Sequence, residues 1–114
     1  MGSQRIVNRK ILLSDKENNL LGIIQIVIWR VDDENYPCGI KYRIVFAKRI
    51  GEDKFDGDFL RYDNEKWKGP HIHRKGKEYP YEFKDIKSLI DDFLKDLGSL
   101  LGLNINEILE RGQK

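Results

Sequence analysis

The sequence lacks paired cysteines, long apolar runs and an excess of charge of one sign. Cys38 is its single cysteine among 114 residues, which excludes an internal disulfide and a cysteine-rich zinc module. The 21 basic and 19 acidic side chains nearly cancel, so any positively charged site must be local. The longest mainly apolar run, residues 20–29, is far shorter than the roughly 20 residues that a helix needs to span a bilayer. We therefore expect no membrane segment, and we expect a cytoplasmic location because residues 1–5 lack the features of a signal peptide.

Alternating apolar residues predict several strands in the first two thirds of the chain. Residues 22–31 are dominated by Ile and Val on both faces, as in a strand that is covered on both sides. Further extended patterns cover residues 9–13, 40–49 and 58–64, and residues 79–83 are a candidate for one more short strand. Because short loops join these segments, we expect a mainly antiparallel sheet of four to five strands.

After residue 83 the apolar period changes to that of a helix. The predicted apolar stripe consists of Ile86, Leu89, Ile90, Phe93, Leu94, Leu97, Leu100 and Leu101. This stripe predicts an amphipathic helix over about 85–101 that covers one face of the sheet. Asn104 followed by Glu107 resembles a capping box, which predicts a short final helix over about 105–111. The expected fold is one α+β domain, residues 1–114, with its sheet over about 9–83.

Polar and titratable side chains concentrate between Arg61 and Arg74, on an irregular connection of the kind that often carries function. Both histidines of the chain lie there, two residues apart, as His71 and His73. If this segment is extended, both imidazoles point to the same side, with Cα atoms about 6.5 to 7 Å apart. The histidine pair is therefore the sharpest chemical feature of the sequence.

Three interpretations of the pair remain open. His71 and His73 could be ordinary surface histidines on an edge strand. They could bind Zn²⁺ or another divalent ion with Asp63 as a third ligand, although that ligand must come from a separate segment. They could also act as acid and base on a scissile phosphate. Without a metal ion, the last arrangement suits RNA, whose 2′-hydroxyl supplies the nucleophile.

Cationic side chains around the histidines favour a phosphate-bearing ligand. The candidates for nucleic-acid binding are Arg43, Arg61, Lys66, Lys68 and Arg74. Trp67, between the two lysines, could stack on a base or pack under the loop as part of the core. Tyr62 and Asp63 precede this basic loop and could position its catalytic groups.

The order of these residues resembles the TumE family of toxins from toxin–antitoxin systems. The resemblance rests on Tyr62-Asp63-Asn64, Lys68-Gly69, His71 and His73, and then Tyr81 and Phe83 leading into the amphipathic helix. It covers roughly residues 9–98. It implies a small bacterial or archaeal toxin that is neutralised by a protein antitoxin encoded beside it. The resemblance does not imply a reaction, so ribonuclease activity is inferred from the histidine pair and the basic loop.

The sequence therefore predicts a toxin that cleaves RNA without a metal ion or other cofactor. His71 and His73 are the predicted acid and base, assisted by Tyr62 and Asp63. The expected partners are a small antitoxin and RNA, with no membrane, and a homo-oligomer is compatible with the sequence. The alternative is a module that uses loop 61–74 to bind nucleic acid or an acidic protein segment without cleaving anything.

Overall fold

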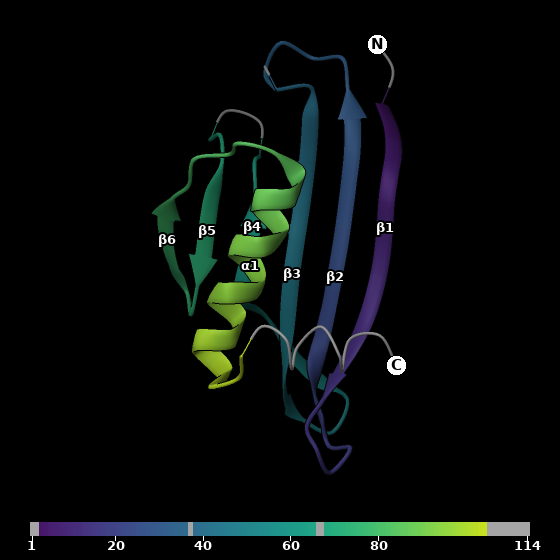
Figure 1. Ribbon diagram of the computed structural model, residues 1–114, viewed down its shortest axis with the longest axis vertical. Helices are drawn as coiled ribbons and strands as arrows, with labels where there is room; N and C mark the ends of the chain where they lie inside the picture. Colours follow the sequence, from purple (N-terminus) through teal and green to yellow (C-terminus); the bar gives the residue numbers. More distant parts are fainter. Residues whose placement is uncertain (1–2, 37, 66–67, 105–114) are drawn as a thin grey trace.

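A six-stranded antiparallel sheet and one helix form the described part of the chain, residues 3–36, 38–65 and 68–104, in a computed structural model (Figure 1). The strands are β1 (Ser3–Ser14), β2 (Leu20–Val31), β3 (Ile40–Gly51), β4 (Lys54–Asp63), β5 (His71–Arg74) and β6 (Lys77–Pro80). The helix is α1 (Ile86–Leu101). The strands lie in sequence order, so each strand pairs with the one that follows it in the chain.

The predicted α+β class and antiparallel sheet are confirmed, but four to five strands was too low a number. β1 begins at Ser3, well before the predicted start at residue 9, because pairing with β2 extends it through residues that are mostly exposed. The last strand is β6, residues 77–80, instead of residues 79–83. The predicted helix over 105–111 lies outside the described residues.

A tight turn that the sequence analysis missed creates β6. Lys75 and Gly76 have φ values of 51° and 82°, and Arg74 pairs directly with Lys77. Two central residues with positive φ form the kind of two-residue turn whose twist matches that of a β-hairpin. The turn places Glu78 opposite His73 in the next strand.

Helix α1 covers one face of the sheet, over β3 and β4 (Figure 1). Its N-terminal cap is Asp85, whose Oδ1 accepts a hydrogen bond from the Ser88 backbone nitrogen at 2.7 Å. It ends at Gly102, which has the left-handed φ of 70° that glycine adopts easily. No helix within the three described ranges is long and apolar enough to cross a membrane.

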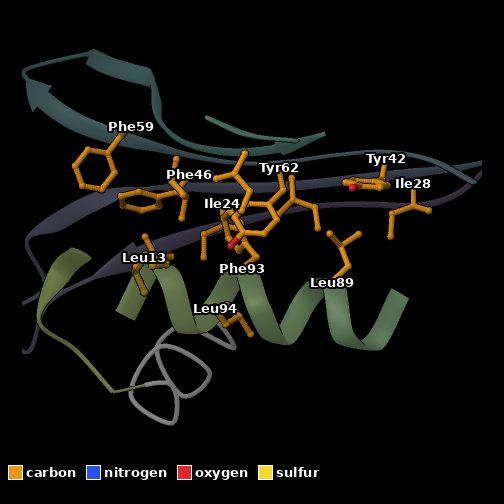
Figure 2. Close-up of a cluster of buried hydrophobic side chains, with 14 residues drawn as sticks. Leu13, Ile24, Ile28, Tyr42, Phe46, Phe59, Tyr62, Leu89, Phe93 and Leu94 are labelled. Atoms are coloured by element: carbon orange, nitrogen blue, oxygen red, sulfur yellow. The ribbon is translucent and has the colours of Figure 1, made fainter. Parts of the chain in front are cut away.

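The hydrophobic core lies between α1 and this face of the sheet, as the prediction of an apolar helix stripe requires. Figure 2 shows side chains of α1 meeting those of the strands across this layer. From the helix, Leu89, Phe93, Leu94 and Leu97 are buried, while the remaining predicted stripe residues are partly buried against them. The sheet contributes Leu13, Ile24, Ile28, Tyr42, Ile44, Phe46, Phe59, Leu60, Tyr62 and Ile72.

The opposite face of the sheet, here called the open face, carries the histidines. Side chains of directly paired residues lie on the same face, whereas successive residues of a strand alternate between faces. Tyr62 and Ile72 form a pair that faces α1. The adjacent pairs, Asp63 with His71 and Arg61 with His73, therefore face away from the helix.

Replacing Phe93 by Ala tests the packing of α1. Phe93 is 1% exposed, and its ring meets the Tyr62 ring edge-on at a centroid distance of 5.6 Å. The cavity left by the truncation should lower the free energy of unfolding by about 3 to 5 kcal/mol in urea denaturation. Lys95→Ala, an exposed change on the same helix, should alter it by less than about 0.5 kcal/mol. Equal effects of the two changes would contradict the assigned orientation of the helix.

Candidate functional site

The pairing of β4 with β5 brings Asp63, His71 and His73 together on the open face. Asp63 is 3% exposed and His71 is 4% exposed, while His73 is partly buried. One potential ligand atom from each of these three side chains lies within 4.8 Å of the other two. Asp63, the third ligand in the metal interpretation, thus comes from β4, the strand next to the one that carries both histidines.

His71 is held on both sides of its ring. Its Nδ1 lies 2.8 Å from the carbonyl oxygen of Gly69, and its Nε2 lies 2.7 Å from Oδ1 of Asp63. A carbonyl oxygen can only accept, so Nδ1 carries a proton and donates it to Gly69. In the neutral ring, the lone pair of Nε2 then points toward Asp63. Gly69 has a φ of 73°, and glycine is the residue best suited to this bend of the loop.

Arg61 contacts the second oxygen of Asp63. Its Nε lies 3.0 Å from Oδ2 of Asp63, and its Nη1 lies 3.1 Å from Oδ1 of Asp58. Because Oδ2 faces the guanidinium, Oδ1 of Asp63 is the oxygen turned toward the histidines. Arg61 thus orients the carboxylate, a role closer to positioning than to the predicted binding of phosphate.

His73 packs against His71 and lies beside a residue that the sequence analysis missed. The two imidazole rings meet edge-on with centroids 4.7 Å apart. Oε1 of Glu78 lies 3.5 Å from Nε2 of His73, 3.8 Å from Nε2 of His71 and 2.7 Å from Nζ of Lys68. The Lys75-Gly76 turn was the sequence feature that could have placed Glu78 here, since it fixes the register of the hairpin.

Charge and burial shift the pKa values of this group in different directions. Burial lowers the pKa of His73 below its usual value, and the positive charges of Arg61 and protonated His71 lower this pKa further. The hydrogen bond between Lys68 and Glu78 raises the pKa of the Lys68 ammonium and lowers the pKa of the Glu78 carboxyl. The ion pair of Lys68 with Glu78 therefore stays charged near neutral pH, whereas His73 favours its neutral form.

The contact of Arg61 Nε with Oδ2 of Asp63 is an ion pair without the direction of a hydrogen bond. Three further buried atoms of this group have no hydrogen-bond partner among the described residues: Oδ1 of Asp63, Nε2 of His71 and Nε2 of His73. The first two are close, but the contact lacks the direction of a hydrogen bond. These atoms could exchange protons with a substrate, or they could hold a divalent cation through two imidazoles and a carboxylate. The interpretation as surface histidines on an edge strand is wrong, because His71 is buried and β6 forms that edge.

Two other predicted site residues lie on the helix side of the sheet. The Tyr62 hydroxyl donates to Oδ2 of Asp96 at 2.8 Å, and Arg74 donates to the same carboxylate from the end of β5. Burial and the hydrogen bond to Asp96 raise the pKa of Tyr62. Tyr62 and Arg74 thus connect the sheet to α1 and are not brought together with the histidine pair.

The remaining predicted residues are placed as follows. Arg43 is exposed on the open face and pairs with Asp63 across the strands, and Lys68 lies over the histidines with Glu78. Lys66 and Trp67 lie outside the described residues.

Asn64 extends the β3–β4 contact beyond the last paired residue. Its Oδ1 accepts from the Tyr42 backbone nitrogen and its Nδ2 donates to the Ile40 carbonyl, both at 2.8 Å. The side chain of Asn64 thus replaces backbone hydrogen bonds where β4 ends. It holds the end of this strand, and with it Asp63, against β3.

Comparison with protein families identifies the class to which this chain belongs. The family model for toxin TumE matches residues 4–101, a range that includes the histidine pair, Asp63, Glu78 and helix α1. This chain belongs to the TumE family of toxins, as the resemblance over roughly residues 9–98 predicted. No curated protein and no solved structure matches the sequence.

Replacing Arg74 by Ala tests whether this residue serves the fold or the site. Because the change leaves the Asp96 carboxylate without one charged donor, the free energy of unfolding should fall by about 1 kcal/mol in urea denaturation. If the protein binds RNA, as the sequence predicts, the folded variant should bind it equally well, since Arg74 faces α1. Lys77→Ala on the same hairpin serves as an exposed control. Weaker RNA binding at an unchanged free energy of unfolding would instead support the predicted role of Arg74 in binding nucleic acid.

Proposed function

We propose that this protein is the toxin of a toxin–antitoxin pair, that it cleaves RNA, and that His71 and His73 are its acid and base. Its family membership supports the toxin role. The observation that carries the reaction is the convergence of two imidazoles on a strand face, with one of them fixed by Asp63 and Gly69. Proton transfer by positioned imidazoles suits a phosphodiester that contains its own nucleophile.

The geometry supports a division of labour between the two histidines. Burial and nearby positive charge lower the pKa of His73 and favour its neutral form, so its Nε2 is suited to take the proton from the RNA 2′-hydroxyl. The 2′-oxygen then attacks phosphorus, the bond from phosphorus to the 5′-oxygen breaks, and protonated His71 gives its Nε2 proton to the departing oxygen. The Gly69 carbonyl orients the His71 ring through Nδ1, the nitrogen that does not react, as the partner of a catalytic histidine does in other enzymes, and the nearby Asp63 carboxylate stabilises the positive charge on the ring.

The ion pair of Lys68 with Glu78 controls access to these atoms. Both side chains are about half exposed, and Oε1 of Glu78 lies within 4 Å of both Nε2 atoms. An RNA phosphate that reaches the histidines must therefore displace the Glu78 carboxylate from Lys68. Lys68 would then pair with the phosphate, which is the role that the sequence predicted for it.

The charge of the open face supports an anionic polymer as the ligand. Lys41 and Arg43 project from β3 on this face and are exposed, and Nζ of Lys41 lies 5.3 Å from the centre of the Trp29 ring. Lys10 lies on the same face, opposite Gln25. Cations spaced across a strand surface with an accessible aromatic ring suit a single-stranded nucleic acid, which offers phosphates and bases.

Replacing His73 by Ala should lower the rate of RNA cleavage by at least about 100-fold, the usual contribution of a general base. Cleavage of a labelled RNA by purified, folded protein is the measurement, with Lys77→Ala as the control on the same hairpin. His73 is a cleaner probe than His71, because truncating the buried His71 also leaves Gly69 and Asp63 without their partner. Retarded migration of RNA without cleavage by the wild-type protein would favour the alternative of a binding module.

Expression of this gene alone should slow the growth of its host, and co-expression of a small neighbouring gene should restore growth. Toxins of this class are held inactive by a protein partner, so the rescue should coincide with a complex that co-purifies. A folded His71→Ala, His73→Ala double variant at wild-type expression level should be harmless. Undiminished toxicity of that variant would contradict the role of the histidine pair while leaving the toxin assignment intact.

A further inference from the structure

We propose that Asp63, His71 and His73 also form a divalent-cation site of the kind that Zn²⁺ prefers. The proposed ligand atoms are the buried Oδ1 of Asp63, Nε2 of His71 and Nε2 of His73, and the three side chains each place one potential ligand atom within 4.8 Å of those of the other two. Zinc sites with three protein ligands commonly combine imidazole nitrogen with carboxylate oxygen and leave a further position open. Such ligands sit roughly 3.3 to 3.5 Å apart around the ion, so Nε2 of His71 and Oδ1 of Asp63, which are 2.7 Å apart, would have to separate by about 0.6 to 0.8 Å to admit it.

Burial is the first argument for this site. The three proposed ligand atoms are buried and have no hydrogen-bond partner within the described ranges. Buried polar atoms in proteins almost always have a partner. Three such atoms from two strands share one small region, and two of them belong to side chains that are more than nine-tenths buried. A cation satisfies all three at once, because each offers a lone pair.

The surrounding contacts are the second argument. The Gly69 carbonyl binds the Nδ1 proton of His71 and leaves Nε2 as the nitrogen with a free lone pair. Histidines that bind metal ions almost always donate their other nitrogen in this way. Arg61 occupies Oδ2 of Asp63 and thereby turns Oδ1 toward the histidines. Both contacts orient ligands without occupying the proposed ligand atoms.

The donor set also selects the kind of cation. Two imidazoles favour Zn²⁺ and similar transition ions over Mg²⁺ and Ca²⁺, which prefer all-oxygen sites. The positive charges of Arg61 and Lys68 oppose cation binding, but the carboxylates of Asp63 and Glu78 balance them. Glu78 lies within 4 Å of both Nε2 atoms, so a fourth oxygen donor is close at hand.

Cation binding and proton transfer would exclude each other. Both use the lone pairs of Nε2 of His71 and His73, and an imidazole nitrogen that binds an ion cannot accept a proton. This consequence rests on the proposed function: bound Zn²⁺ should inhibit RNA cleavage, and a chelator should restore it. The existence of the site does not rest on that function.

Calorimetric titration of the untagged full-length chain with Zn²⁺ tests the site directly, and visible absorption of bound Co²⁺ reports the donor set. We expect one ion per chain. His73→Ala and Asp63→Asn should each weaken binding at least 10-fold, with folding verified by circular dichroism. Cys38→Ser is the essential control, because Cys38 is an exposed thiol that could bind either ion, and Glu82→Gln controls for an exposed carboxylate. Absent binding, or binding that only Cys38→Ser weakens, would overturn the proposal.

Cleavage of RNA with and without Zn²⁺ separates the two proposals. His73→Ala protein should have too little activity for inhibition by Zn²⁺ to be measured. The inhibition is therefore tested in wild-type protein, where a chelator should restore RNA cleavage. Cleavage that is unaffected at a saturating Zn²⁺ concentration would overturn the competition. Cleavage that requires Zn²⁺ would support the site and overturn metal-independent proton transfer. No cleavage under any condition would overturn the proposed reaction, while the titration would still decide whether the cation site exists.

Discussion

The antiparallel register of β4 and β5 is the constraint on which the candidate site depends. It sets Asp63 beside His71 and Arg61 beside His73, and it extends from β5 into β6 to add Glu78. Because side chains alternate with a period of two, a shift of β5 by one residue would turn His71 and His73 to the helix side, away from Asp63 and Arg61. The core opposes such a shift, since Ile72 would then leave its place beside Tyr62 in the core.

The same alternation divides a polar segment into two groups with different tasks. Tyr62 and Arg74 meet Asp96 of α1 and fix the helix over the sheet, while Asp63, His71 and His73 meet one another on the opposite face. A buried aspartate beside two histidines is costly to maintain unless its charge is balanced. Arg61 balances it, and the Arg61–Asp63 contact is therefore part of what allows the group to exist.

The proposed proton transfer and the proposed cation binding both depend on Nε2 of His71 and Nε2 of His73, two buried atoms without a hydrogen-bond partner among the described residues. The contacts that prepare an imidazole to act as an acid or base also prepare it to bind an ion: a fixed tautomer, an oriented carboxylate and exclusion from water. Lys68 and Glu78 cover these atoms with an ion pair that either a phosphate or a cation must rearrange.

The sequence by itself determined the fold class, the long central strands and the apolar stripe of α1, because these follow from local periodicity. It also determined the family, and it predicted that His71 and His73 share one face of the sheet, since their spacing places both on one face of any extended strand. Tertiary structure alone decided that β1 begins at Ser3 and that β6 exists, because pairing with a neighbour stabilises residues whose own pattern is weak. It likewise separated Tyr62 and Arg74 from the histidines and joined Asp63 and Glu78 to them, since the partner of a side chain in a sheet is set by cross-strand register rather than by distance along the chain.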